Sequence, residues 1–285
     1  MAVNRSYFFK DGKKLALGER TLVMGILNVT PDSFSDGGCW NSVDAAIRHM
    51  LQMAADGADI IDIGAESSRP GFVPMAAEEE MERLRPFLKA LLPRCPVPVS
   101  VDTFKAETAA MAAEMGVHII NDIQGLQYAE EPGRMAEVAA AHDMPVVVMH
   151  NQSCSYYKED IMSSMKNFFQ HSLQVADEAG LRRENIIFDP GIGFGKTAEQ
   201  NLEVLGRLHE MKRIDGEEYP LLLGTSRKSF IGRVLNLPVE ERMEATGATC
   251  VAGIMQGVSI VRVHDVKPIA RMCRMTDAIL AKRER

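Results

Sequence analysis

The sequence lacks the features of disulfide-rich, zinc-binding and membrane proteins. Its five cysteines are scattered and odd in number, with no Cys-x-x-Cys pair, which favours reduced thiols over a disulfide framework or a zinc site. No stretch approaches the ~18 apolar residues of a membrane span, and residues 1–20 lack the apolar core of a signal peptide. We therefore expect no membrane association and a cytoplasmic location.

The sequence also lacks a surplus of basic residues. Its formal net charge is −7, whereas a protein that binds nucleic acid needs a basic surface for the phosphates. We therefore expect no nucleic-acid partner, although a local group of Arg, Lys and His could still bind a small anion. No linker, low-complexity tract or charge run divides the chain, which predicts a single domain over residues 1–285.

Short apolar runs, each followed by a helical pattern, recur along the whole chain. They are continuous rather than alternating, as expected for strands buried on both faces. The predicted strands are 22–29, 59–64, 97–101, 117–123, 145–149, 185–188, 220–223 and 258–263. The predicted helices are 43–56, 77–92, 106–115, 133–142, 160–179, 199–213, 240–256 and 267–283. Eight such units predict an α/β fold, a (β/α)8 TIM barrel; a doubly wound sheet is the alternative but usually has fewer strands.

Polar side chains follow nearly every predicted strand, where the active site of a barrel forms. They are Asn28, Asp62, Asp102, Asn121, Asp122, His150, Asp189, Lys228, Arg262 and His264. Any one of them could be a helix cap or a turn residue, and His264 could equally be a partly buried structural histidine. Arg, Lys and His are poor caps, however, so the set as a whole predicts a functional site on one rim.

The glycine-rich segment 189–197 resembles a phosphate-binding loop only in part. Gly195, Lys196 and Thr197 match the end of that motif, but its first glycine would fall on Pro190, which has no N–H to offer a phosphate. The glycine spacing also misses the dinucleotide fingerprint. We therefore do not predict a nucleotide site.

Eight segments in chain order together resemble the dihydropteroate synthase family of pterin-binding enzymes. They are MGILNVTPDSFSD (24–36), DIGAESSRPG (62–71), VDT (101–103), NDI (121–123), VMH (148–150), DPGIGFGK (189–196), GTSRKS (224–229) and RVHD (262–265). A departure lies in the second of these segments, because Ser68 stands where the family commonly has Thr. The hydroxyl is kept, so we expect activity, while sensitivity to sulfonamides, which target this family, is left open.

The resemblance implies a homodimeric barrel that uses Mg²⁺ in folate synthesis. The amine of 4-aminobenzoate displaces diphosphate from 6-hydroxymethyl-7,8-dihydropterin diphosphate to give 7,8-dihydropteroate. The implied pterin residues are Asp102, Asn121, Met149, Asp189 and Lys228, with Ile123 and Phe194 beside the ring. The implied diphosphate residues are Asn28, Ser68, Arg69, Arg262 and His264, with Asn28 also on the metal. The implied 4-aminobenzoate residues are Phe34, Ser68, Pro70, Phe194 and Ser229.

The chemistry of these side chains agrees with the implied roles. A buried carboxylate can accept the parallel N–H donors of a pterin edge as it would those of an arginine. The implied catalytic residues are Asp102, Asp189, Lys228, Arg262 and His264, and we predict a dissociative reaction in which diphosphate leaves first. Ser229 could anchor a carboxylate at a helix start or be an ordinary helix residue.

Two alternatives of other kinds stay open. A methyltransferase acting on methyltetrahydrofolate would share Asp102, Asn121 and Asp189 but has no use for the diphosphate residues. A catalytically dead barrel that serves as a binding subunit would not need the motif residues, which are intact in this sequence.

Overall fold

The computed structural model describes residues 3–30, 38–66 and 75–283 and contains a single-domain barrel of parallel strands. The barrel strands are β3 (Leu22–Asn28), β4 (Ile60–Gly64), β5 (Val99–Asp102), β6 (Ile119–Asp122), β7 (Val146–Met149), β8 (Ile186–Asp189), β11 (Leu222–Leu223) and β12 (Ile260–Val263). Their order around the sheet is β11-β12-β3-β4-β5-β6-β7-β8, and a bridge between Phe188 and Leu221 joins β8 to the β11 side. The predicted (β/α)8 barrel is confirmed.

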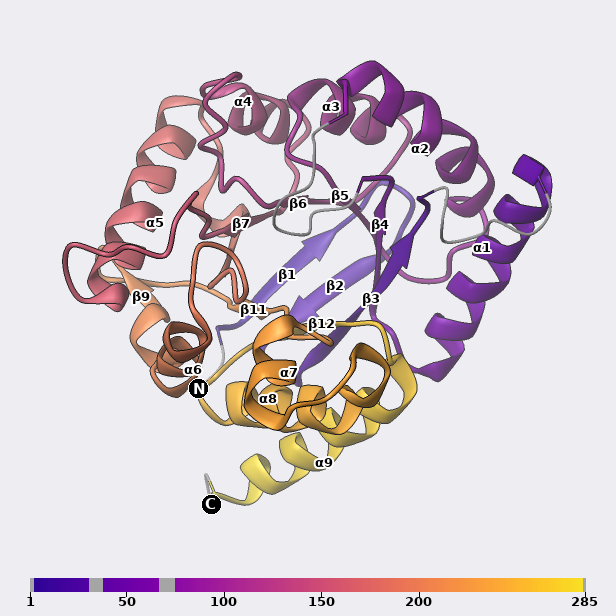
Figure 1. Cartoon of the computed structure of the whole chain (residues 1–285). Coiled ribbons are helices and arrows are strands. Elements are labelled where there is room, and N and C mark those ends of the chain that lie inside the picture. Colours follow the sequence, from indigo (N-terminus) through magenta and orange to yellow (C-terminus); the bar gives the residue numbers. More distant parts are fainter. Residues whose placement is uncertain (1–2, 31–37, 67–74, 284–285) are drawn as a thin grey trace.

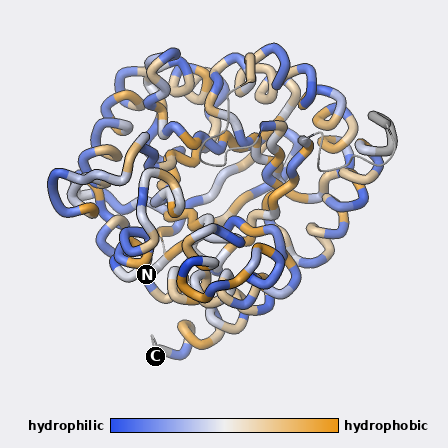
Figure 2. Tube along the Cα trace, viewed as in Figure 1, coloured by the Kyte–Doolittle hydropathy of each residue, from blue (hydrophilic) through white to orange (hydrophobic). Residues whose placement is uncertain are grey.

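Helices surround the barrel on its outer side (Figure 1). They are α1 (Gly38–Asp56), α2 (Ala77–Leu91), α3 (Ala106–Glu114), α4 (Arg134–Ala141), α5 (Ile161–Glu178), α6 (Ala198–Gly206), α7 (Ser229–Leu235), α8 (Met243–Met255) and α9 (Val266–Arg283). Hydrophobic residues concentrate on the strands and on the inner sides of the helices, and hydrophilic residues lie outside (Figure 2). This is the pattern of amphipathic helices that cover a sheet buried on both faces.

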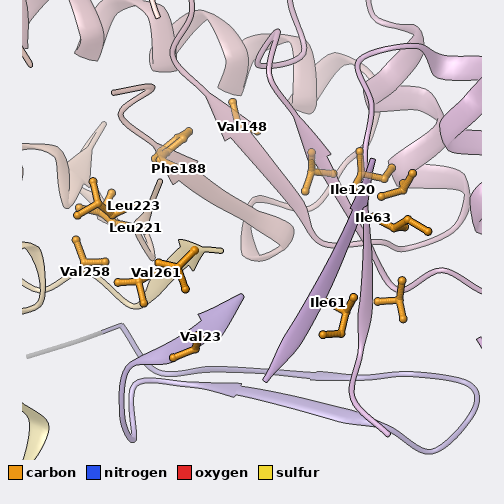
Figure 3. Packing of buried hydrophobic residues seen from close by; sticks show 14 of the residues in the cluster. Val23, Ile61, Ile63, Ile120, Val148, Phe188, Leu221, Leu223, Val258 and Val261 are labelled. Atoms are coloured by element: carbon orange, nitrogen blue, oxygen red, sulfur yellow. The ribbon is translucent and has the colours of Figure 1, made fainter. Parts of the chain in front are cut away.

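Alternate residues of each strand belong to two separate cores. Outward-facing residues such as Val23, Ile61 and Val148 pack among the helices (Figure 3). Their neighbours Met24 and Ile60 point inward and pack with the inward residues of the other strands. The two cores follow from the two-residue period of a strand, which sends successive side chains to opposite faces.

An N-terminal hairpin, which the sequence analysis did not predict, closes one end of the barrel. Strands β1 (Arg5–Phe8) and β2 (Lys14–Leu17) pair antiparallel and cross the barrel end (Figure 1). Tyr7, Leu15 and Leu17 join the inward-facing core, and the Tyr7 hydroxyl donates to the carbonyl of Glu184, just before β8, at 2.8 Å. The hairpin therefore seals the end at which the parallel strands begin.

Several other elements also differ from the predictions. The predicted helix 199–213 ends at Gly206 and is followed by a 3-10 turn and a small hairpin of β9 (Arg213–Ile214) and β10 (Glu217–Glu218). Its turn residues, Asp215 and Gly216, have positive φ angles, and Asp-Gly is a strong hairpin signal. The predicted helix 240–256 begins only at Met243, and α7 was not predicted. Within the described residues, no helix has the length and apolar character to cross a lipid bilayer.

Candidate active site

The pterin residues expected from the motifs lie side by side at the ends of adjacent strands. Asp102 and Asn121 are register partners on β5 and β6, and Met149 and Asp189 are partners on β7 and β8. Asp102, Asn121 and Asp189 are only 8%, 4% and 5% exposed. Parallel strands bring these positions to one rim because all their carboxyl ends point the same way.

Arg262 reaches from β12 to two carboxylates at this rim. Its Nε donates to Asp62 Oδ2 and its Nη2 donates to Asp102 Oδ2, both at 2.6 Å. Asn121 Nδ2 donates to the same oxygen of Asp62 at 3.1 Å. Arg262 was expected beside the diphosphate, but in the structure it is already shared with the pterin side of the site. Asp62, fully buried, was recognised as a strand-end residue and given no role, because sequence spacing does not reveal which carboxylates an arginine will join.

Asp189, Lys228 and Arg262 converge around Gly224. A Cβ atom added at Gly224 would lie 3.8 Å from Asp189 Oδ2, 3.9 Å from Lys228 Nζ and 4.0 Å from Arg262 Cβ. Lys228 Nζ also donates to the carbonyl of Ile192. The carboxylates and the cations are therefore at one mouth of the barrel, which is the geometric condition for the expected chemistry.

Burial sets the protonation behaviour of this group. Burial raises the pKa of Asp102, with Arg262 opposing it and Asp62 adding to it. Burial also raises the pKa of Asp189, against the attraction of Lys228. Burial lowers the pKa of Lys228 to about 8, with Asp189 opposing. Shifts of this kind, combined with specific charge partners, are typical of functional sites.

A small apolar cluster borders the polar residues and is separate from the two barrel cores. It consists of Phe104, Ile123 and Met149, with the partly buried Tyr128 and Phe194 packed against it. The ring centroid of Phe194 lies 4.8 Å from Lys228 Nζ. Ile123, Met149 and Phe194 were the expected ring-sandwiching residues, and the structure brings them together. Phe104 and Tyr128 were missed, although Phe104 directly follows the Val-Asp-Thr segment.

The last expected residues surround the rim or fall outside the described part of the chain. His264 is anchored there, because its Nδ1 lies 2.9 Å from Ser226 Oγ and its backbone N–H donates to the same oxygen at 3.1 Å. Asn28 and Ser229 are exposed, at the end of β3 and the start of α7. The remaining expected residues lie outside the described residues: Phe34, Ser68, Arg69 and Pro70.

A buried charge cluster next to β5 was not predicted. Lys105 Nζ contacts Glu66 Oε2 at 2.5 Å and Glu80 Oε2 at 3.1 Å. Glu66 Oε1 also accepts a hydrogen bond from the backbone N–H of Met75 at 2.7 Å. The cluster thus links Glu66 and Met75, which follow β4, to Lys105, which follows β5. The sequence motif that contains Glu66 was recognised, but its partner Lys105 lies far away in sequence and was not.

A family model confirms the class of protein that this fold and site define. The model, described as pterin binding enzyme, matches residues 24–264. The chain is therefore a pterin-binding barrel enzyme.

Relatives and solved structures narrow the class to one family. The chain is 49% identical to a dihydropteroate synthase of Clostridium beijerinckii, covering 95% of this chain and 98% of the relative. It is 52% identical to the Bacillus subtilis dihydropteroate synthase, covering 94% and 92%. A Clostridium difficile dihydropteroate synthase crystallised in the presence of pteroic acid superposes with a TM-score of 0.88 at 50% identity, covering 92% of this chain and 98% of that chain. A Xanthomonas albilineans dihydropteroate synthase with 4-aminobenzoic acid gives 0.87 at 36% identity, covering 95% and 97%. This chain belongs to the dihydropteroate synthase family.

Proposed function

We propose that this chain joins 4-aminobenzoate to 6-hydroxymethyl-7,8-dihydropterin diphosphate, forming 7,8-dihydropteroate and diphosphate in folate synthesis. The observation that carries the proposal is the convergence of Asp102 and Asp189 with Lys228 and Arg262 at one rim. Family membership supports it, as do the relatives solved with pteroic acid and with 4-aminobenzoic acid.

The pterin would bind edge-on to the buried polar residues. Asp189 would accept the parallel N–H donors of the pterin, since a carboxylate binds such a fork as it binds a guanidinium. Asp102 and Asn121 would complete the edge, and Lys228 would donate to the ring acceptors. Met149 would pack against the ring face, because it belongs to the apolar cluster bordering these groups.

The diphosphate would lie on the β12 side of the rim. Arg262 uses two N–H groups on Asp62 and Asp102, and its other N–H groups would donate to diphosphate oxygens. His264, held by Ser226, would add a second donor, and we retain Ser68 and Arg69 as expected contacts. Asn28 fits a magnesium ligand, because it is exposed at the end of β3 and Mg²⁺ takes few protein oxygens beside phosphate. When bound, Mg²⁺ would neutralise negative charge on the diphosphate.

The 4-aminobenzoate would lie against Phe194, the described member of its apolar wall. Phe34 and Pro70 would complete this wall. The Ser68 and Ser229 hydroxyls would donate to its carboxylate, and Ser229 is exposed at the start of α7.

The proposed reaction is dissociative. The carbon–oxygen bond to diphosphate breaks first, and its electron pair leaves with the diphosphate beside Arg262 and His264. The electron-rich dihydropterin carries the methylene cation, which the negative field of Asp102 and Asp189 stabilises. The lone pair of the aromatic amine then forms the carbon–nitrogen bond, and the amine releases a proton.

Two measurements test the proposal. Diphosphate release that requires 4-aminobenzoate would distinguish this enzyme from a methyltransferase and from an inactive barrel, neither of which releases diphosphate. Positional exchange of oxygen isotope between the bridging and non-bridging positions of the pterin substrate, without amine, tests the dissociative step. Absence of exchange under all conditions would favour direct displacement.

We further propose that the chain forms a homodimer in the cytoplasm. The apolar side chains of Met275 and Ile279 on α9 are 64% and 50% exposed, and Met255 on α8 is 48% exposed. Exposed apolar residues on neighbouring helices are typical of a subunit interface. Light scattering of the purified protein would test the dimer, and replacing Met275 and Ile279 by polar residues should weaken it.

A further inference from the structure

The lysine of the glycine-rich loop points into the protein rather than toward a ligand. Lys196 Nζ lies 2.8 Å from His150 Nδ1 and donates to the carbonyls of Gly191 at 3.0 Å and Phe194 at 3.1 Å. An ammonium group has three donors, and these three acceptors match them. Lys196 thus bonds to the backbone of the loop that precedes it.

The glycines of this loop allow its backbone to approach a neighbouring segment closely. Gly191 and Gly195 have φ angles of +62° and +56°, which other residues rarely adopt. A Cβ at Gly191 would lie 1.9 Å from the carbonyl oxygen of His150, and a Cβ at Gly195 would lie 2.5 Å from that of Gln152. The loop therefore runs against the backbone that follows β7, where a larger residue at either glycine would not fit.

These contacts lead directly to the proposed substrate wall. The carbonyl of Phe194 is one of the three acceptors of Lys196, and the Phe194 ring packs against the Met149 cluster. On the other side of the loop, Lys228 donates to the carbonyl of Ile192. Two lysines thus donate to carbonyls of the loop, Lys228 from the proposed pterin site and Lys196 from the His150 side.

The charges around Lys196 favour this arrangement. Burial, together with the nearby charge of Lys196, lowers the pKa of His150 to about 2, so the imidazole is neutral and its Nδ1 can accept a hydrogen bond. Burial also lowers the pKa of Lys196, with Asp189 opposing. Because protein acceptors already take the three donors of this buried amine, Lys196 is poorly placed to bind a phosphate.

We infer that Lys196 is a positioning residue that fixes Phe194 as the wall for the 4-aminobenzoate ring. This inference rests on the proposed function of the site. Lys196 acts through the loop backbone and needs no contact with either substrate.

Lys196→Met tests the inference, because methionine keeps a side chain of similar length and removes the hydrogen-bond donors. We expect the KM for 4-aminobenzoate to rise about tenfold, with a smaller change in kcat and in the KM for the pterin substrate. Lys196→Gln, which retains two donors, should recover part of the loss. In a Phe194→Leu background, Lys196→Met should change the KM for 4-aminobenzoate less than about twofold, since the residue through which it acts is already altered.

Three results would decide against the inference. One is an unchanged KM for 4-aminobenzoate in Lys196→Met, and another is a pair of effects that multiply independently in the double variant. The third is a Lys196→Gln protein that folds normally, by its melting temperature, yet shows equal losses for both substrates. If the unmodified protein released no diphosphate with 4-aminobenzoate, the proposed function itself would fail instead.

Discussion

Asp102→Asn separates the catalytic charge of Asp102 from its shape. The amide keeps an oxygen that can accept from Arg262 Nη2, now 2.6 Å from the carboxylate, and it removes one negative charge. Arg262 keeps its ion pair with Asp62, so the substitution does not leave a buried guanidinium without a counter-ion. The variant therefore changes mainly the field at the reacting carbon.

The expected loss can be estimated from these contacts. Removing one preorganised group that faces charge developing in the transition state costs about 10²–10³ in kcat. Replacing a charged acceptor by a neutral one costs about 1 kcal/mol in ground-state binding, or about fivefold in the KM for the pterin substrate. We therefore expect kcat to fall by a much larger factor than that KM rises.

The folding stability of Asp102→Asn should rise or stay unchanged, although its kcat falls. Burial raises the pKa of Asp102, so the folded state binds a proton more readily than the unfolded state. Such a carboxyl group makes folding less favourable as the pH rises above its unfolded pKa. At pH 8, Asp102→Asn should consequently melt no lower than the unmodified protein.

Steady-state diphosphate release, with each substrate varied in turn, would measure the kinetic effect. Asp177→Asn is a matched control, because Asp177 also pairs with an arginine but is exposed on α5. It should leave both constants unchanged. A KM for the pterin substrate that rises by the full factor lost in kcat/KM, with kcat intact, would refute the transition-state role of Asp102.

Further variants probe the other parts of the site. Since burial lowers the pKa of Lys228 to about 8, kcat/KM should fall above that pH as the ammonium deprotonates; Lys228→Arg should move this limb to higher pH, and an unmoved limb would contradict the assignment. Lys105→Met leaves two buried glutamates without their cation and should lower the free energy of unfolding in urea by about 3–5 kcal/mol; an unchanged midpoint would contradict this. Gly191→Ala forces a Cβ to within 1.9 Å of the His150 carbonyl oxygen and should reduce activity at least about tenfold, whereas Gly206→Ala, with no neighbouring atom within 4 Å, should behave as wild type.

Much of the architecture could be predicted because each strand carries its own signal. Continuous apolar runs and the polar residues that follow them are local in sequence, so eight strands and the residues of their rim were identifiable. The hairpin of Tyr7 and Leu15 was not, because its strands are four residues long and its partner surface comes from the whole barrel.

The missed parts of the site depend on contacts between distant residues. The sequence placed Arg262 and Asp102 at strand ends, but the ion pair with Asp62 spans 200 residues and follows from the closed barrel. Lys196 matched half of a phosphate-binding motif, and only the backbone path of the loop shows that its donors are used internally. Local patterns thus identify which residues matter, whereas their pairing depends on the three-dimensional arrangement.

The N-terminal hairpin leaves the barrel open at one end only. Tyr7, Leu15 and Leu17 fill the closed end together with the inward-facing strand residues. Substrates can then enter only through the opposite mouth of the barrel. The diphosphate must leave through the same opening by which 4-aminobenzoate enters. The proposed subsites for diphosphate and 4-aminobenzoate therefore share one opening to solvent.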